Sequence, residues 1–259
     1  MSAGAHVAIL TETAGAIARI QIARPERKNA ITAAMYAALA DALIAADADP
    51  GVQAVLLHGL PEIFTAGNDL EDFLREPPQN DEAPVFRFMT ALSGVAKPVV
   101  AAVNGAAVGV GTTMLLHCDL VYCADDSRFS LPFVNLGLCP EFGSSLLLPL
   151  TAGYRRAAEK LLLGEPASAE EALEMGIVNR ILPPAEVLGH ARNQCERLAR
   201  VSPSAVLETK RLMKAGWRED VQRAIREESS AFVRLLGSPE ARAAFRAFLE
   251  RRAPDSAKR

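Results

Sequence analysis

Apolar positions near the start of the chain follow first a strand-like and then a helix-like spacing. Residues 7–22 partly alternate polar and apolar side chains around Ala14 and Gly15, which predicts two strands joined by a turn. Thr32 can act as the N-cap of a helix that runs to about residue 47. This helix would bury one apolar stripe, formed by Tyr36, Leu39, Leu43 and Ala46. The apolar run 53–59 then predicts a buried strand.

The middle of the chain repeats this order. Residues 64–70 are expected to form a loop that opens a short helix, and the acidic, proline-containing residues 76–83 a mobile surface loop. A helix is predicted over about 85–93. The uncharged stretch 98–116 is nearly long enough to span a bilayer, but its asparagine and glycines favour a buried strand, a turn and a helix from near Gly109. Residues 119–124 and 128–131 are predicted as further strands.

From about Pro184 the pattern is helical throughout, with Pro203 and Pro239 at breaks or in first turns. The whole order predicts an α/β fold with a helical C-terminal appendage. We expect a core over residues 1–200 and a helical oligomerisation region over residues 201–259. The last helix should place Phe245, Phe248 and Leu249 on one face, and these residues together with Val233 and Leu235 predict an assembly of several chains.

Composition narrows the class of protein. The chain has 259 residues, of which 50% are hydrophobic and 23% charged, as expected for a globular protein with a large core. A formal net charge of −3 provides no overall field to attract nucleic acid or an anionic membrane. Four cysteines without a CxxC pair and only four histidines indicate no metal site, and free thiols suit a reducing, cytoplasmic location.

Two loops share one pattern, residues 65–69 (TAGND) and 107–111 (AVGVG). Each follows a buried strand, contains glycine beside small residues and opens a helix. Unpaired N–H groups at two such helix starts, aimed at one point, would form an oxyanion hole. The alternative is that both are ordinary tight turns. Neither loop has a phosphate-binding glycine pattern.

Glu141 is the only acidic or basic side chain in residues 131–145 (LPFVNLGLCPEFGSS). Apolar neighbours would raise the pKa of this carboxyl and make it a candidate general base. The alternative is an ordinary glutamate at a helix start, where negative charge is favoured. His58 and His117 lie in apolar stretches and are expected to be core residues rather than catalysts.

Six segments, spread over nearly the whole chain, resemble the motifs of the crotonase (enoyl-CoA hydratase/isomerase) superfamily. They are RPERKNA at 24–30, FTAGNDL at 64–70, VNGAAVGVG at 103–111 with CDL at 118–120, the segment 129–145, ALEMGIV at 172–178 and AFLERRAP at 247–254. The resemblance implies a spiral of ββα units, C-terminal helices that build a homotrimer or a dimer of trimers, and an acyl-CoA thioester as substrate. It implies no cofactor other than the CoA that forms part of the substrate.

The resemblance also implies roles for individual residues. The backbone N–H groups of Asn68 and Val110 would form the oxyanion hole. Thr113 and Phe133 occupy the positions where the hydratases carry two glutamates, and neither can hold a titrating proton. Glu141 lies where one isomerase branch carries its acidic residue, which favours an isomerase with a single base. A hydratase, another crotonase reaction on an acyl-CoA and a non-catalytic acyl-CoA-binding scaffold remain alternatives.

A further set of residues is expected to contact the substrate: Arg27, Lys28, Ala30, Ala66, Gly67, Asp69, Leu70, Gly109, Pro132, Phe133, Leu136 and Phe142. Arg27 and Lys28 would meet the CoA phosphates, although basic loop residues are often simply solvated. Asp69 is expected to cap the following helix rather than to contact the ligand.

Overall fold

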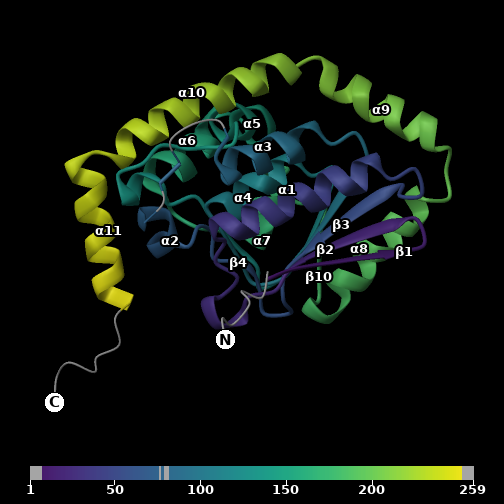
Figure 1. Ribbon diagram of the computed structural model, residues 1–259, viewed down its shortest axis with the longest axis horizontal. Helices are drawn as coiled ribbons and strands as arrows, with labels where there is room; N and C mark the ends of the chain where they lie inside the picture. The colour runs from purple at the N-terminus through teal and green to yellow at the C-terminus, as the bar shows by residue number, and fades with distance from the viewer. Residues whose placement is uncertain (1–7, 76, 79–81, 253–259) are drawn as a thin grey trace, which may run out of the picture.

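The computed structural model describes residues 8–75, 77–78 and 82–252, and it consists of two β-sheets surrounded by helices (Figure 1). In this part of the chain a six-stranded sheet has the order β1-β2-β3-β5-β7-β10, and a four-stranded sheet has the order β4-β6-β8-β9. The larger sheet comprises β1 (Ile9–Ala14), β2 (Ile17–Ile22), β3 (Ala54–His58), β5 (Val99–Val103), β7 (Leu120–Ala124) and β10 (Arg180–Leu182). The smaller sheet comprises β4 (Ile63–Thr65), β6 (Ala106–Val108), β8 (Arg128–Ser130) and β9 (Ala167–Ser168).

From β3 to β8, successive strands alternate between the two sheets. The chain leaves the larger sheet after β3, β5 and β7, and each time it enters the smaller sheet as β4, β6 and β8. Within each sheet, the strands from successive turns pair in parallel: β3–β5–β7 in the larger sheet and β4–β6–β8 in the smaller one. The pairs β1–β2 and β8–β9 are antiparallel. Each turn of the chain therefore contributes one strand to each sheet, and the expected α/β spiral of ββα units is confirmed.

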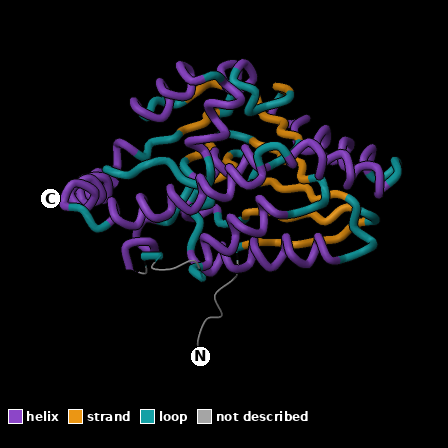
Figure 2. Tube along the Cα trace, turned by 90° about the horizontal axis from the view of Figure 1, so that it is seen from above, coloured by secondary structure: helices purple, strands orange, loops and turns teal. Residues whose placement is uncertain are grey.

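The larger sheet is buried on both faces, which explains the continuous apolar runs in its strands. On β3, Val55 and Leu57 face the main core, whereas Ala54 and Leu56 face a second cluster formed with α8 (Pro184–Leu198). In the view from above, helices lie on both sides of the strands (Figure 2).

The first helix, α1 (Ala33–Ala48), begins as the sequence predicts. Thr32 is its N-cap and accepts a hydrogen bond from the N–H of Met35 at 3.3 Å. The four residues of the predicted apolar stripe are all buried. Against this stripe packs α3 (Pro84–Gly94), where Phe88 lies with its ring centroid 5.5 Å from that of Tyr36.

The shortest elements differ from the expectation. Phe64 and Thr65, predicted as loop, belong to β4, and the stretch after Gly105 forms β6 before the helix α4 (Val110–Thr113) begins. A strand of two or three residues contains too few positions to show a periodicity. The loop at 64–70 does open a short helix, α2 (Leu70–Arg75). Three more α-helices lie between β8 and β10 along the chain: α5 (Ser144–Ala152), α6 (Tyr154–Leu163) and α7 (Ala169–Glu174).

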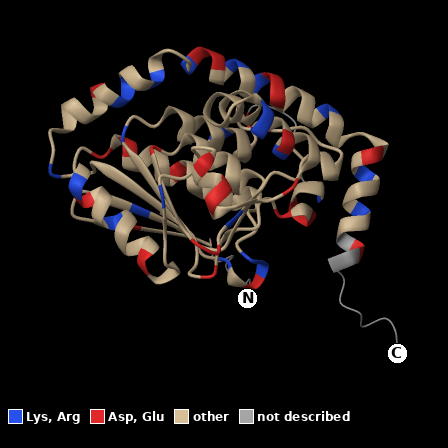
Figure 3. Cartoon of the chain, turned by 180° about the vertical axis from the view of Figure 1, so that it is seen from behind, with Lys and Arg blue, Asp and Glu red and all other residues tan. Residues whose placement is uncertain are grey.

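The C-terminal part is helical, as predicted. After α8, the helices α9 (Pro203–Ala215), α10 (Arg218–Leu236) and α11 (Pro239–Arg252) form an arch around the outside of the core, with Pro203 and Pro239 in first turns (Figure 1). Basic and acidic residues are spread along this arch (Figure 3). The boundary at residue 200 remains a prediction.

One face of α11 is used within the chain itself. Phe245 is fully buried, and α11 packs over the short helix η3 (Val134–Leu136) and Gly137. Phe248 is half-buried, and the side chain of Leu249 lies outside the described residues. Phe245 is therefore not available to a neighbouring chain, contrary to the reasoning from its sequence position.

Two other predicted segments have definite outcomes. The uncharged stretch 98–116 forms β5, β6 and α4, and within the described ranges no helix combines the length and the apolar character needed to cross a bilayer. In the predicted surface loop 76–83, residues 76 and 79–81 lie outside the described residues. Pro78 is buried, so this part of the segment packs on the protein rather than extending into solvent.

Candidate active site

The two glycine loops lie side by side because their strands, β4 and β6, pair in parallel with Thr65 opposite Ala107. A Cβ atom on Gly67 would lie 2.6 Å from the carbonyl oxygen of Val108. A Cβ atom on Gly111 would lie 2.4 Å from Cγ2 of Thr65. Each loop therefore approaches the other so closely that only glycine fits at the contact.

The contact leaves two backbone N–H groups without a partner. The N–H of Ile31 donates to the carbonyl oxygen of Gly67, and the carbonyl oxygen of Ile31 accepts from the N–H of Asp69. These two bonds lie on either side of Asn68 and do not use its N–H. Val110 is the first residue of α4 and follows Gly109, whose φ of 55° suits glycine alone. Within the described chain, neither the N–H of Asn68 nor that of Val110 donates a hydrogen bond. These are the two groups that the sequence predicts as an oxyanion hole.

Tyr36 fixes the side chain of Asn68. Its hydroxyl donates a short hydrogen bond to Oδ1 of Asn68, and Tyr36 is itself buried. Burial, followed by the negative charge of Glu141, raises the pKa of Tyr36 well above its ordinary value, so the phenol stays protonated. The sequence indicates Tyr36 only as a core residue, because a hydroxyl on an apolar stripe gives no separate signal.

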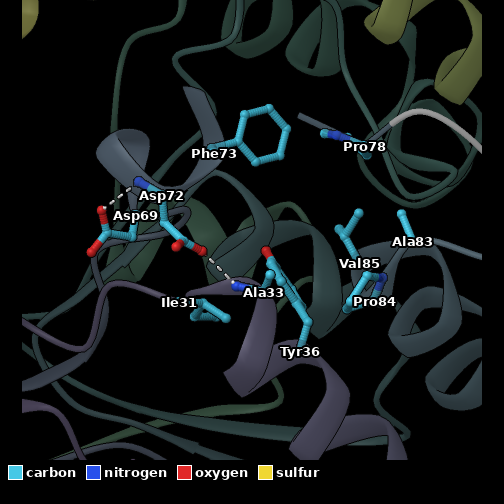
Figure 4. Close-up of a pocket in the computed structure, with 10 residues that line it drawn as sticks. All are labelled: Ile31, Ala33, Tyr36, Asp69, Asp72, Phe73, Pro78, Ala83, Pro84 and Val85. Carbon is cyan, nitrogen blue, oxygen red and sulfur yellow. Dashed lines mark hydrogen bonds between the residues drawn. The ribbon is translucent and has the colours of Figure 1, made fainter. Parts of the chain in front are cut away.

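A small pocket lies beside Tyr36 (Figure 4). Its walls come from α1, α2, α3 and the segments before them, and its lining residues are Ile31, Ala33, Tyr36, Asp69, Asp72, Phe73, Pro78, Ala83, Pro84 and Val85. Its volume of about 30 Å³ admits water but not an acyl chain.

The asparagine of the RPERKNA motif holds the loops together. Lys28 and Asn29 both adopt left-handed backbone conformations, with φ of 51° and 58°. The buried amide of Asn29 donates to the carbonyl oxygens of Ile22 at 2.9 Å and Phe64 at 3.0 Å. The hydroxyl of Thr65 in turn donates to the carbonyl oxygen of Asn29 at 2.6 Å. Asn29 thus links β2, β4 and its own loop, and these bonds hold the loop at 65–69 in place.

Charged residues of the two motifs pair with each other. Asp69 is buried, caps α2 by accepting from the N–H of Asp72 at 3.3 Å, and forms an ion pair with Arg24 at 2.7 Å. Burial acts to raise the pKa of Asp69, but the hydrogen bond and charge of Arg24 outweigh it and lower the pKa. Arg27 pairs with Glu71 at 2.6 Å, and Lys28 is exposed. The capping role expected of Asp69 is confirmed.

Glu141 is 5% exposed, and its carboxyl accepts a hydrogen bond of 2.5 Å from the hydroxyl of Thr113 on α4. Burial raises the pKa of Glu141 to about 8; the Thr113 hydrogen bond opposes the increase, and the charge of Glu228 adds to it. Helix α5 begins only at Ser144, after the N-cap Gly143. The Glu141 carboxyl therefore bonds to α4 rather than to the N-terminal turn of α5, in contrast to an ordinary helix-start glutamate.

A second buried carboxylate, Glu228 on α10, occupies the start of α5 instead. Its oxygens accept hydrogen bonds from the N–H groups of Gly143 and, at 2.8 Å, Ser145. The sequence does not indicate this role, because Glu228 stands in a polar run, REESS, that resembles a solvated helix face. Only the helical spacing from the buried Val221, Ile225 and Phe232 could have placed it on the inner face.

Two predicted contact residues on the segment that carries Glu141, Phe133 and Phe142, are buried. The ring of Phe133 lies next to Gly109, within 3.9 Å of where a Cβ would be. Phe142 is fully buried, with its ring centroid 4.0 Å from His117 and 5.8 Å from Phe88. Burial lowers the pKa of His58 and of His117 to about 4, which confirms both as neutral core histidines. Of the other predicted contact residues, Ala30 and Gly67 are buried, and Ala66, Leu70, Pro132 and Leu136 are half-buried.

In the described part of the chain, no three His, Cys, Asp or Glu side chains are grouped closely enough to hold a metal ion. The four cysteines are free thiols.

A two-sheet ββα spiral with free backbone amides on two paired loops and a buried carboxyl on a third segment is the arrangement that the resemblance to the crotonase superfamily implies. Residues 12–259 match the family model described as enoyl-CoA hydratase/isomerase, and the chain belongs to this family.

Curated relatives in the family have several different activities. The chain is 34% identical to enoyl-CoA delta isomerase 2 of Rattus norvegicus over 232 residues, which cover 87% of this chain and 59% of that protein. It is 34% identical to a carnitinyl-CoA dehydratase of Salmonella arizonae, covering 93% and 95%. It is 30% identical to the 2,3-dehydroadipyl-CoA hydratase of Escherichia coli, covering 90% and 91%.

Solved structures support the fold. The chain is 49% identical to Pseudomonas aeruginosa OdaA, with a TM-score of 0.92 over 93% of this chain and 98% of that one. It is 40% identical to an enoyl-CoA hydratase/isomerase from Pseudoalteromonas atlantica, with a TM-score of 0.90 over 95% and 98%.

Proposed function

We propose that this protein is an acyl-CoA isomerase that moves a C–C double bond from C3 to C2 of an enoyl-CoA thioester, with Glu141 as its single base. The observation that carries the proposal is the contact between Glu141 and Thr113. Position 113 is where the resemblance to the hydratases would put an acid, and here the carboxyl of Glu141 reaches it from another loop. One titrating group is then available at that point, and an isomerase needs only one.

The reaction divides into two proton transfers. The Glu141 carboxylate removes a proton from C2, and the electron pair of that C–H bond moves to the thioester oxygen as a dienolate forms. The N–H groups of Asn68 and Val110 hold this oxygen. The Glu141 carboxylic acid then returns the proton at C4, and the double bond is left between C2 and C3. A base whose pKa is about 8 suits this task, because it is strong enough to remove the proton and acidic enough to return it.

The alternatives differ in how many titrating groups they need. Hydration requires one group to activate water and one to protonate the α-carbon, and neither Thr113 nor Phe133 can titrate. Some relatives are named hydratase, dehydratase or dehalogenase, so hydration or another crotonase reaction on an acyl-CoA is the second candidate. A non-catalytic acyl-CoA-binding scaffold would retain the oxyanion hole without needing a buried carboxyl beside it.

A panel of 2-enoyl and 3-enoyl CoA thioesters tests the proposal, read by the ultraviolet absorbance of the conjugated 2-enoyl group. The protein should convert 3-enoyl-CoA to 2-enoyl-CoA and hydrate crotonyl-CoA slowly or not at all. Glu141→Gln keeps the size of the side chain but removes the base, so turnover should drop by roughly 10²- to 10⁴-fold with CoA binding nearly unchanged. Glu141→Asp should retain part of the rate, because the carboxyl is present but displaced.

Three results would contradict the proposal. Hydration as fast as isomerisation would mean that another group activates water. Isomerisation by Glu141→Gln within a few-fold of the parent would place the base elsewhere, and no turnover of any thioester in the panel would favour the scaffold.

A further inference from the structure

The helix α10 is hydrogen-bonded to the segment that carries Glu141 at two places: the thiol of Cys139 donates to the backbone carbonyl oxygen of Glu228 at 3.8 Å, and the side chain of Glu228 accepts from the loop backbone. Glu228 is buried, and its two carboxyl oxygens accept from the N–H groups of Gly143 and Ser145, which lie 85 and 83 residues away in the sequence. Hydrogen bonds to an ionised carboxylate are about twice as strong as neutral ones. Burial raises the pKa of Glu228, and the hydrogen bonds from Ser145 and Gly143 act against that increase by favouring the charged form. The two bonds tie α10 to the backbone of residues 143–145.

The loop adopts a conformation that needs such support. Phe142 and Gly143 both have left-handed backbones, with φ of 60° and 73°. A bulky residue in this region costs about 1–2 kcal/mol, so it persists only where its surroundings hold it. Ser144 bonds back to the carbonyl oxygen of Glu141 through its N–H at 3.2 Å and its hydroxyl at 2.6 Å. The conformation that turns Glu141 toward Thr113 also turns the next N–H groups toward Glu228.

We propose that Glu228 is a positioning residue for Glu141: it clamps the 143–145 backbone so that the Glu141 carboxyl stays beside Thr113 and the oxyanion-hole amides. This inference rests on the proposed function, because it takes Glu141 as the base. Glu228 is not among the residues that line the pocket of Figure 4. Through Glu228, the packing of the C-terminal arch determines where the base lies.

Charge couples the two carboxyls as well. Burial contributes most to the raised pKa of Glu141, and the charge of Glu228 raises it further. The other titratable groups that interact with Glu141 are Tyr36 of α1 and Cys139 of its own loop, and burial raises the pKa of both. His117, which bonds the carbonyl oxygen of Phe142, is neutral above about pH 4. Glu228 is thus the group whose removal changes the electrostatics around Glu141.

The chain offers a matched control for this test. Glu228→Gln removes the charge and one of the two acceptors, whereas Glu227→Gln makes the same change on the exposed neighbouring position of α10. At pH 9.5, where Glu141 is ionised in every variant, Glu228→Gln should lower kcat roughly 10- to 100-fold with KM changed less than a few-fold. The midpoint of its pH–rate profile should move to lower pH. Glu227→Gln should match the parent in all three quantities.

Glu228→Asp separates charge from geometry. It keeps the negative charge on a shorter arm, so its midpoint should stay nearer that of the parent while kcat falls. A residue with only a structural role would lower the melting temperature without moving the midpoint. If Glu228→Gln does not fold, Glu228→Asp tests the positioning role through a lower kcat at pH 9.5 with KM little changed, and Glu227→Asp is its control.

A measurement without substrate distinguishes failure of this inference from failure of the proposed function. Carbon-13 NMR of labelled glutamate carboxyls, with Glu141→Gln to assign the signal, titrates Glu141 directly. A lower Glu141 pKa in Glu228→Gln, but not in Glu227→Gln, supports the coupling even if isomerase activity is absent. An unchanged Glu141 titration together with the parental kcat in Glu228→Gln would overturn the inference.

Discussion

Glu141 and Glu228 are both buried carboxyls, but their hydrogen bonds differ in kind. Glu141 accepts one bond from a hydroxyl, whereas Glu228 accepts two from backbone N–H groups. Backbone donors fix a carboxylate in place, and a single hydroxyl donor leaves it able to gain and lose a proton. Glu141 is therefore suited to proton transfer, and Glu228 is suited to holding the loop backbone in place.

The raised pKa of Glu141 has a consequence for stability. A carboxyl whose pKa rises from 4.5 to about 8 on folding binds its proton more tightly in the folded state. Its contribution to stability is fully present below pH 4.5 and is lost as the pH rises toward 8, by at most about 1.4 kcal/mol per pH unit. Glu141→Gln has no proton to lose. Urea unfolding at pH 5 and pH 9 should show the variant gaining a few kcal/mol over the parent at the higher pH. A pH-independent difference between the two would mean that Glu141 ionises normally.

Glu141 was accessible to sequence analysis because it is the only charge in an apolar stretch. Three other residues of the site were not. Glu228 stands among polar residues, the hydroxyl of Tyr36 belongs to an apolar stripe, and Asn29 is one polar residue in a polar motif. Their roles depend on partners 32 to 85 residues away, a distance over which a local pattern holds no information.

The elements that build the site differ in how well the sequence predicts them. Long strands such as β3 and β5, and helices such as α1 and α3, were predicted because each repeats its burial pattern over several positions. The strands of the smaller sheet, which bring the glycine loops together, have only two or three residues. The loops were found through their glycines, and their contact became visible only with the pairing of β4 and β6.

That contact gives a prediction at Gly111. An added Cβ would meet Cγ2 of Thr65, which cannot rotate away without breaking the bonds of its hydroxyl to Asn29 and to the N–H of Gly67. Gly111→Ala should therefore lower the free energy of unfolding by about 1–3 kcal/mol and reduce isomerase kcat. Adding Thr65→Ser, which removes Cγ2 but keeps the hydroxyl, should restore most of both. Gly189→Ala on α8, where nothing lies within 4 Å, is the control and should be neutral or slightly stabilising. A double variant no better than Gly111→Ala would place the conflict at another atom.

At the scale of the whole molecule, the chain leaves apolar side chains uncovered. Large exposed residues gather on the neighbouring helices α5 and α6, namely Leu150, Tyr154, Leu162 and Leu163, and others lie on α9, namely Leu212 and Met213. Tyr154 is 75% exposed, and Leu162 is 68% exposed. Contiguous apolar patches on a surface usually mark an interface. With Phe245 used inside the chain, these residues, rather than the face of α11, carry the prediction of an assembly.

We expect a trimer or hexamer in solution, held in part by the α5–α6 patch. Sedimentation velocity at micromolar concentration should give the mass of three or six chains. The double change Leu162→Glu and Leu163→Glu should shift the mass toward the monomer, because burying two carboxylates in an apolar contact is strongly unfavourable. Leu10→Glu is the matched control, since Leu10 is 54% exposed on the edge strand β1, and it should leave the mass unchanged. A stable parental monomer would refute the assembly. An unchanged mass in the double variant would instead move the interface to α9, where Met213 is 67% exposed.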